Sequence, residues 1–88
     1  MPEKRVMCWF HMIKKVDDAL KSVKNEWSST IRADISEIQK VKNLVHFEIA
    51  TKLFDSKWRK KEDFLVDNFL DYFNAQWVKK LPGWFEGN

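Results

Sequence analysis

Apolar side chains recur along almost the whole chain at steps of three and four residues, the spacing of one face of an α-helix. A β-strand does not use this repeat, because its side chains alternate with a period of two. Glycine and proline, which supply the many turns of an all-β chain, number only two each in 88 residues. The pattern therefore predicts an all-α fold of about four helices, packed as a small bundle in one domain over residues 1–88.

Four segments carry the helical repeat. The first is expected to run from about Val6 to Lys24. Polar residues 25–30 are expected to supply a turn and an N-cap for a second, shorter helix, because short oxygen-bearing side chains accept hydrogen bonds from free backbone N–H groups. The core-facing positions expected in these two helices are Trp9, Ile13, Val16, Leu20 and Val23, then Trp27, Ile31, Ile35 and Ile38.

The second half of the chain repeats the pattern. Asn43 is placed to cap a third helix, with Leu44 and Leu53 beside its core face. A fourth helix is expected to begin with the acidic pair Glu62-Asp63, which suits the positive end of a helix dipole, and to stop at Leu81-Pro82-Gly83. Its expected core-facing positions, after those of the third helix, complete the list: Phe47, Ala50, Phe54 and Trp58, then Val66, Phe69, Phe73 and Trp77.

Residues 82–88 form a C-terminal tail that contains Trp84 and Phe85. Two large aromatic residues are unusual in a terminal tail, where side chains are mostly polar. Either they pack back onto the helices, or a larger protein continues beyond Asn88. If they are exposed, they are candidate partner-binding residues, because aromatic side chains often anchor protein interfaces.

The segment 57–61 interleaves Trp58 with the cations Lys57, Arg59, Lys60 and Lys61, in a chain of net charge +3. Such a patch can hold phosphates while an indole stacks on a base, which makes these five residues candidates for weak, nonspecific DNA contact. The alternative is structural. Because Trp58 is in register with Phe54, it can close the apolar face of its helix while the cations face water.

Cys8 and His11 have the only spacing that suggests a ligand pair, since residues three apart share a helix face. A structural zinc ion needs about four ligands, and no second cysteine or paired histidine completes a set, so we expect no metal site. Asp67 and Asp71 also share a helix face, but exposed carboxylates are more often solvated.

A single cysteine fits a reducing compartment. No apolar stretch of signal-peptide length follows residues 1–5, and no apolar run is long enough to cross a bilayer, so we expect neither a secretory leader nor a membrane helix. We therefore expect a nuclear or cytoplasmic protein that has no membrane partner.

Several short segments, in this order, resemble Mutator-like element transposases. The segment 6–12 resembles their C-x-x-H motif, and Gly83-Trp84-Phe85-Glu86-Gly87 resembles a later stretch. Between them, 31–35, 52–58, 69–73 and Gln76-Trp77 also look like that family. The resemblance covers nearly the whole chain, and the order and spacing of the segments are more specific than any one of them.

The resemblance implies a place in a larger enzyme. These transposases have a ribonuclease H-like domain with three carboxylates that bind Mg²⁺ or Mn²⁺, and a helical insertion separates the second from the third. This sequence matches only the insertion region, with Cys8 and His11 at its front edge. We therefore expect no catalytic residue, no cofactor and no enzyme activity. The expected function is that of a fragment or domesticated remnant that contacts DNA or protein; the alternative is a helical interaction module that docks through Trp84 and Phe85.

Overall fold

The computed structural model describes residues 9–80 and 84–85. These residues form an all-helical structure without a β-strand, so the expected fold class and the expected four helices are confirmed. A short 3₁₀ turn follows the first helix, and a π-helical segment continues the last one. In chain order, the elements are α1 (Trp9–Ala19), the 3₁₀ turn (Leu20–Ser22), α2 (Asn25–Gln39), α3 (Leu44–Arg59), α4 (Phe64–Phe73) and the π segment (Asn74–Lys80).

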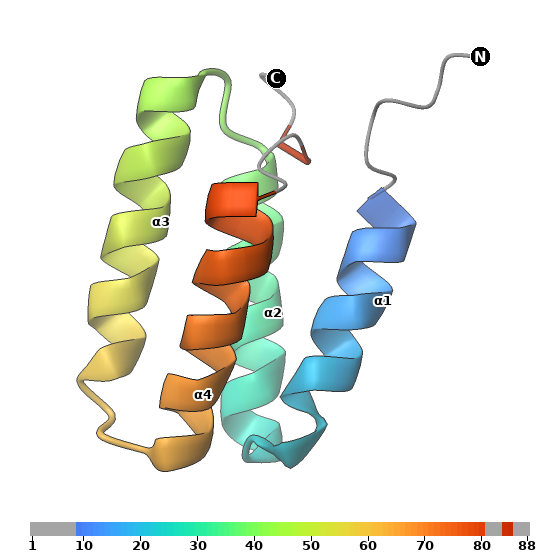
Figure 1. Cartoon of the computed structure of the whole chain (residues 1–88), viewed down its shortest axis with the longest axis vertical. Coiled ribbons are helices and arrows are strands. Elements are labelled where there is room, and N and C mark those ends of the chain that lie inside the picture. Colours follow the sequence, from blue (N-terminus) through green and yellow to red (C-terminus); the bar gives the residue numbers. More distant parts are fainter. Residues whose placement is uncertain (1–8, 81–83, 86–88) are drawn as a thin grey trace.

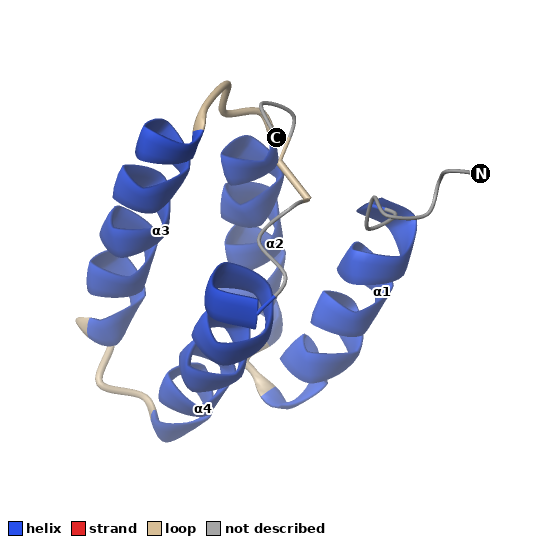
Figure 2. Ribbon diagram, turned by 45° about the horizontal axis from the view of Figure 1, so that its top comes forward, coloured by secondary structure: helices blue, strands red, loops and turns tan. Residues whose placement is uncertain are grey.

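The helices run up and down alternately, so each lies antiparallel to the next one in the chain (Figure 1). The connections α1–α2 and α3–α4 lie at one end of the bundle, and the connection α2–α3 lies at the other. Figure 2 shows α3 and α4 side by side, with α2 behind them and α1 on the far side from α3. Short connections between antiparallel neighbours are typical of small helical bundles.

The first turn of the bundle differs from the sequence prediction. The chain reverses at Val23 and Lys24, and α2 begins at Asn25, so the expected turn in 25–30 is wrong. The hydroxyl groups of Ser28 and Thr30 donate hydrogen bonds to carbonyls one turn earlier in α2, at 3.1 Å each. These bonds give the hydroxyl groups acceptors inside the helix, so the polar side chains do not interrupt it. As a result α2 has 15 residues and begins earlier than the sequence predicts.

The starts of α3 and α4 are set by side-chain caps. The Asn43 side chain accepts a hydrogen bond from the backbone N–H of His46 at 2.8 Å, which confirms the expected cap. Asp63 caps α4 in the same way, accepting from two backbone N–H groups. Glu62 lies outside the helix with a φ of 53°, the left-handed conformation in which the chain leaves α3. The acidic pair therefore precedes the first turn of α4 instead of forming it.

The core forms where the predicted apolar faces meet. All the expected core-facing residues are buried except Trp9, Trp27 and Ala50, which are half-buried against the core. Met12 and Leu70 are buried with them. Leu44 and Leu53 are instead exposed, so their expected place beside the core face is wrong.

Trp84 lies at the centre of the aromatic packing and joins three helices. Its ring stacks on Trp9 of α1 at a centroid distance of 6.1 Å and meets Phe47 of α3 and Phe73 of α4 edge-on at 5.3 and 5.9 Å. Its indole N–H donates a hydrogen bond to the carbonyl of Trp77 at 2.7 Å. This bond satisfies one of the carbonyls that the end of a helix leaves without an internal partner.

Trp77 and Phe85 complete this arrangement. The Trp77 side chain is fully buried, and its indole N–H donates to the Tyr72 hydroxyl at 3.0 Å. Phe85 stacks on Phe47 at 4.4 Å and is only 5% exposed. Of the two alternatives for the tail, the structure therefore shows Trp84 and Phe85 packed back onto the helices.

We expect Trp84→Ala to lower the free energy of unfolding by about 3–5 kcal/mol, because it empties a buried aromatic site. Trp84→Phe keeps a ring but leaves the Trp77 carbonyl without its donor, and should cost about 1–2 kcal/mol. Phe10→Ala, at a residue 77% exposed, is the control and should change stability by less than about 0.5 kcal/mol. Urea unfolding followed by far-ultraviolet circular dichroism measures all three. Equal stability of Trp84→Ala and Phe10→Ala would contradict the central role of Trp84.

Candidate functional site

The structure describes only one residue of the pair Cys8 and His11. Cys8 lies outside the described residues, and His11 is an exposed residue of α1. Within residues 9–80 and 84–85, no group of three or more histidine, cysteine or acidic side chains is arranged to hold a metal ion.

The patch 57–61 turns out to be tied to the bundle. Trp58 is 2% exposed, and its indole N–H donates to Asp34 of α2 at 2.9 Å. Lys57 binds the same Asp34 oxygen at 2.8 Å. The structural interpretation of Trp58 is thus confirmed: it is not available to stack on a base while the bundle is folded.

Arg59, in the same patch, binds carboxylates of α3 and α4. It donates to Asp55 at 3.2 Å and to Asp71 at 2.9 Å, and its Nη1 lies 3.7 Å from Asp67. The hydrogen bond that Arg59 donates to Asp71, together with the charges of Asp55 and Asp71, raises the pKa of Arg59 above its ordinary value in spite of partial burial. The raised pKa means that the charged form is favoured in the folded state and that these contacts are lost only as strongly alkaline pH is reached. Asp67 and Asp71 therefore face an arginine.

Lys60 and Lys61 are the two exposed cations of the patch that bind no carboxylate among the described residues. The ammonium group of Lys61 lies over the rings of Trp27 and Trp58, at 5.6 Å from each centroid. Lys24, from the α1–α2 connection, also lies over Trp27, with its ammonium group 4.7 Å from the ring centroid. The cations of one end of the bundle thus surround two tryptophans, with Lys60 beside them in the chain.

Trp84 and Phe85 do not form an exposed docking pair. They are 3% and 5% exposed and belong to the core. The exposure that their partner-binding role requires is therefore not observed, because these two side chains pack against aromatic residues of α1, α3 and α4.

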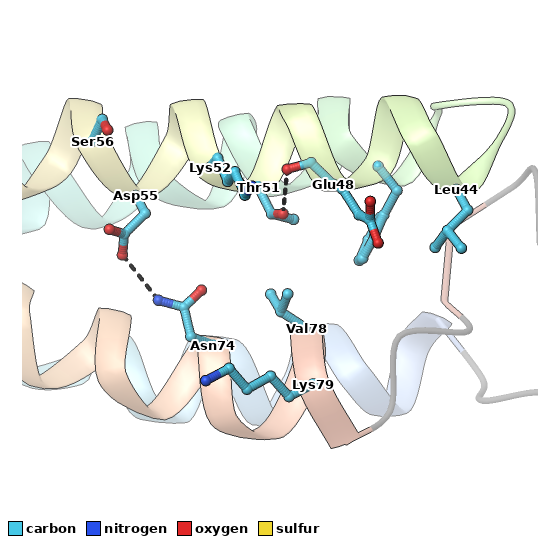
Figure 3. Close-up of a pocket in the computed structure, with 10 residues that line it drawn as sticks. Leu44, Glu48, Thr51, Lys52, Asp55, Ser56, Asn74, Val78 and Lys79 are labelled. Carbon is cyan, nitrogen blue, oxygen red and sulfur yellow. Dashed lines mark hydrogen bonds between the residues drawn. The ribbon is translucent and has the colours of Figure 1, made fainter.

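A groove of about 750 Å³ runs between α3 and the end of α4 with its π segment (Figure 3). Leu44, Phe47 and Val78 provide apolar surface at one end, and the other end is polar. There the Asn74 side chain donates to Asp55 at 2.9 Å, across the groove. Lys52 and Lys79 line the groove from opposite helices, and both are exposed. Neither lysine has an ion-pair partner among the residues that the structure describes.

The side of α3 that faces away from the core carries Val45, Ile49 and Leu53, here called the α3 outer face. Their exposed fractions are 63%, 52% and 65%. Steps of four residues place the three side chains in one row along the helix, on the side opposite the buried Phe47 and Phe54. Lys52 is exposed on the same helix and also lines the groove, so the α3 outer face runs beside the groove.

Sequence reasoning missed this face. The signal was present, since Val45, Ile49 and Leu53 repeat at four-residue steps, but the sequence does not tell whether a second apolar row is exposed or covered by another helix. The rows are distinguished only by the larger aromatic residues of the inner one.

Comparison with protein families, curated proteins and solved structures finds no match for this chain. No helix in the described part of the chain combines the length and apolar character needed to cross a membrane.

Proposed function

We propose that this chain is a non-enzymatic helical binding module and that the α3 outer face is the surface through which it contacts a protein partner. The observation that carries this proposal is the row of Val45, Ile49 and Leu53, each more than half exposed. Single exposed aliphatic residues are common, but a contiguous apolar row is typical of interaction surfaces. The alternative through Trp84 and Phe85 would require both side chains to leave the core, at the cost of the packing that joins α1 to α3 and α4.

We further propose that the module corresponds to the helical insertion of a Mutator-like transposase, as a fragment or a domesticated remnant. The support is the order and spacing of the matching segments, together with the helical character of the described residues. In this interpretation the module lies between the second and third metal-binding carboxylates and contains neither. Two-metal phosphoryl transfer requires those carboxylates, so the chain by itself has no catalytic role.

The docking role predicts that polar changes on the α3 outer face abolish binding without unfolding the bundle. We expect the double variant Ile49→Gln, Leu53→Gln to keep its stability within about 0.5 kcal/mol, because both positions are exposed and glutamine is a good helix former. Natural protein fragments selected by display on the wild-type chain should bind this variant at least about tenfold more weakly. Phe10→Gln is the matched control, because it makes the same kind of change at an exposed position of α1. Fragments that bind the double variant as well as they bind the wild type would contradict the proposal.

The proposed ancestry predicts that the purified chain does not cleave or transfer DNA strands. We expect no product above background when supercoiled and linear DNA are incubated with it and Mg²⁺ or Mn²⁺. Gel electrophoresis of the products checks this. Turnover that persists through successive purification steps would contradict the assignment as a non-catalytic insertion.

A second candidate function is weak contact with the DNA backbone through the end of the bundle that carries Lys24, Lys60 and Lys61. The observation that favours it is the convergence of exposed lysines from two connections around Trp27 and Trp58. Phosphate contacts of this kind raise affinity without sequence preference.

This candidate predicts steep salt dependence, with a slope of log affinity against log salt of roughly −0.9 for each phosphate contacted on duplex DNA. Lys60→Gln with Lys61→Gln should weaken binding and reduce the slope. Lys14→Gln with Lys15→Gln is the matched control, because it removes the same charge from an exposed part of α1. Fluorescence anisotropy at several salt concentrations measures both. Equal losses in the two double variants would show that only net charge matters and would remove this candidate.

A further inference from the structure

The last helical segment, Asn74–Lys80, is π-helical, a form that is rare in proteins and often marks a functional site. A carbonyl in an α-helix accepts from the N–H four residues later, whereas a carbonyl in a π-helix accepts from the N–H five residues later. Pro82 follows this segment in the sequence, and proline has no backbone N–H to donate. The hydrogen-bond register therefore decides which carbonyl Pro82 leaves without a donor.

The carbonyl that loses its donor differs between the two registers. In the α register it would be that of Val78, which is half-buried on the wall of the groove. In the π register it is that of Trp77, a residue with no exposed surface, where a carbonyl without a partner is costly. The indole N–H of Trp84 donates to this carbonyl at 2.7 Å. A side chain of the tail thus replaces the donor that Pro82 cannot provide.

A second contact favours the same register. The indole N–H of Trp77 donates to the Tyr72 hydroxyl, five residues earlier, at 3.0 Å. Around an α-helix, side chains five residues apart are separated by about 140°, so they point away from each other. The wider turn of a π-helix brings such positions closer to one face. The bond between Trp77 and Tyr72 therefore stabilises the π register, and the α register would break it.

We propose that Asn74–Lys80 is an element with two registers, which the seated Trp84 holds in the π form and which returns to the α form when the Trp84 indole no longer donates. Each step of an α-helix turns further around the axis, so Val78 and Lys79 then move relative to Asn74, which is hydrogen-bonded across the groove (Figure 3). The seating of one tail side chain thereby sets the shape of one wall of the groove. This inference does not depend on the proposed docking function, because it uses no residue of the α3 outer face.

NMR scalar couplings across hydrogen bonds test the register directly, because they identify the carbonyl that accepts each amide proton. In the wild-type chain we expect the N–H of Val78 to couple to the carbonyl of Phe73, five residues earlier. The indole N–H of Trp84 should couple to the carbonyl of Trp77. Coupling of the Val78 N–H to the carbonyl of Asn74, four residues earlier, in the wild-type chain would overturn the proposal.

Trp84→Phe removes the indole N–H and keeps an aromatic ring in its place. We expect the coupling of the Val78 N–H to Phe73 to be lost in this variant and to be replaced by coupling to Asn74. The indole N–H of Trp77 should also exchange with solvent faster than in the wild type, because the α register separates it from its acceptor. Far-ultraviolet circular dichroism checks that the bundle is still folded.

Two further variants make the test specific. Trp84→benzothienylalanine keeps the size and shape of the side chain but has sulfur where the indole has its N–H, so it decides the question if Trp84→Phe does not fold. It should show the same change of register. Trp27→Phe is the matched control, because it removes an indole N–H from α2, and it should keep the coupling of the Val78 N–H to Phe73. If the benzothienylalanine variant keeps that coupling, or if Trp27→Phe loses it as well, the register does not depend on the Trp84 indole and the proposal is overturned.

Discussion

The packing of Trp84 is the interaction on which the rest of the structure depends. The four helices are too short to be stable individually, because isolated helices of 10 to 16 residues have only marginal stability in water. The Trp84 ring contacts α1, α3 and α4 together, and its indole N–H satisfies the Trp77 carbonyl at the end of the chain's last helical segment. One side chain near the C-terminus thus closes a bundle whose other long-range contacts join mainly neighbouring helices. This explains why the two aromatic residues of the tail belong to the core and not to a docking surface.

Charged side chains, like Trp84, join helices to one another. Asp34 binds Trp58 and Lys57 of α3, and Arg59 joins the acidic side chains of α3 and α4. These contacts tie the last turns of α3 to α2 and to α4. They also occupy half of the cations in 57–61. Lys52 and Lys79, which have no ion-pair partner among the described residues, line the groove between α3 and the end of α4 together with Glu48.

The helical periodicity of the sequence was enough to predict the fold class, the number of helices and nearly all of the core. It was enough because each predicted row was long and rich in large side chains, and burial of such rows dominates folding. Cap residues also located the start of α3, since Asn43 has a local role that is independent of packing. The candidate site was predicted less well. Trp58 could be assigned to a helix face from its register with Phe54, but Cys8 lies outside the described residues, and the α3 outer face was not recognised at all.

What the sequence by itself determined was therefore local: which segments are helical, where Asn43 starts one of them, and which side chains share a face. The tertiary structure decided three things that depend on neighbours in space. It decided that 25–30 continue as helix, since the turn can be made at Val23 and Lys24. It decided that Trp84 and Phe85 are buried, because only the assembled helices leave an aromatic site for them. It decided that Val45, Ile49 and Leu53 stay exposed, because the described helices pack only against the aromatic row of α3, which has the larger apolar surface to bury.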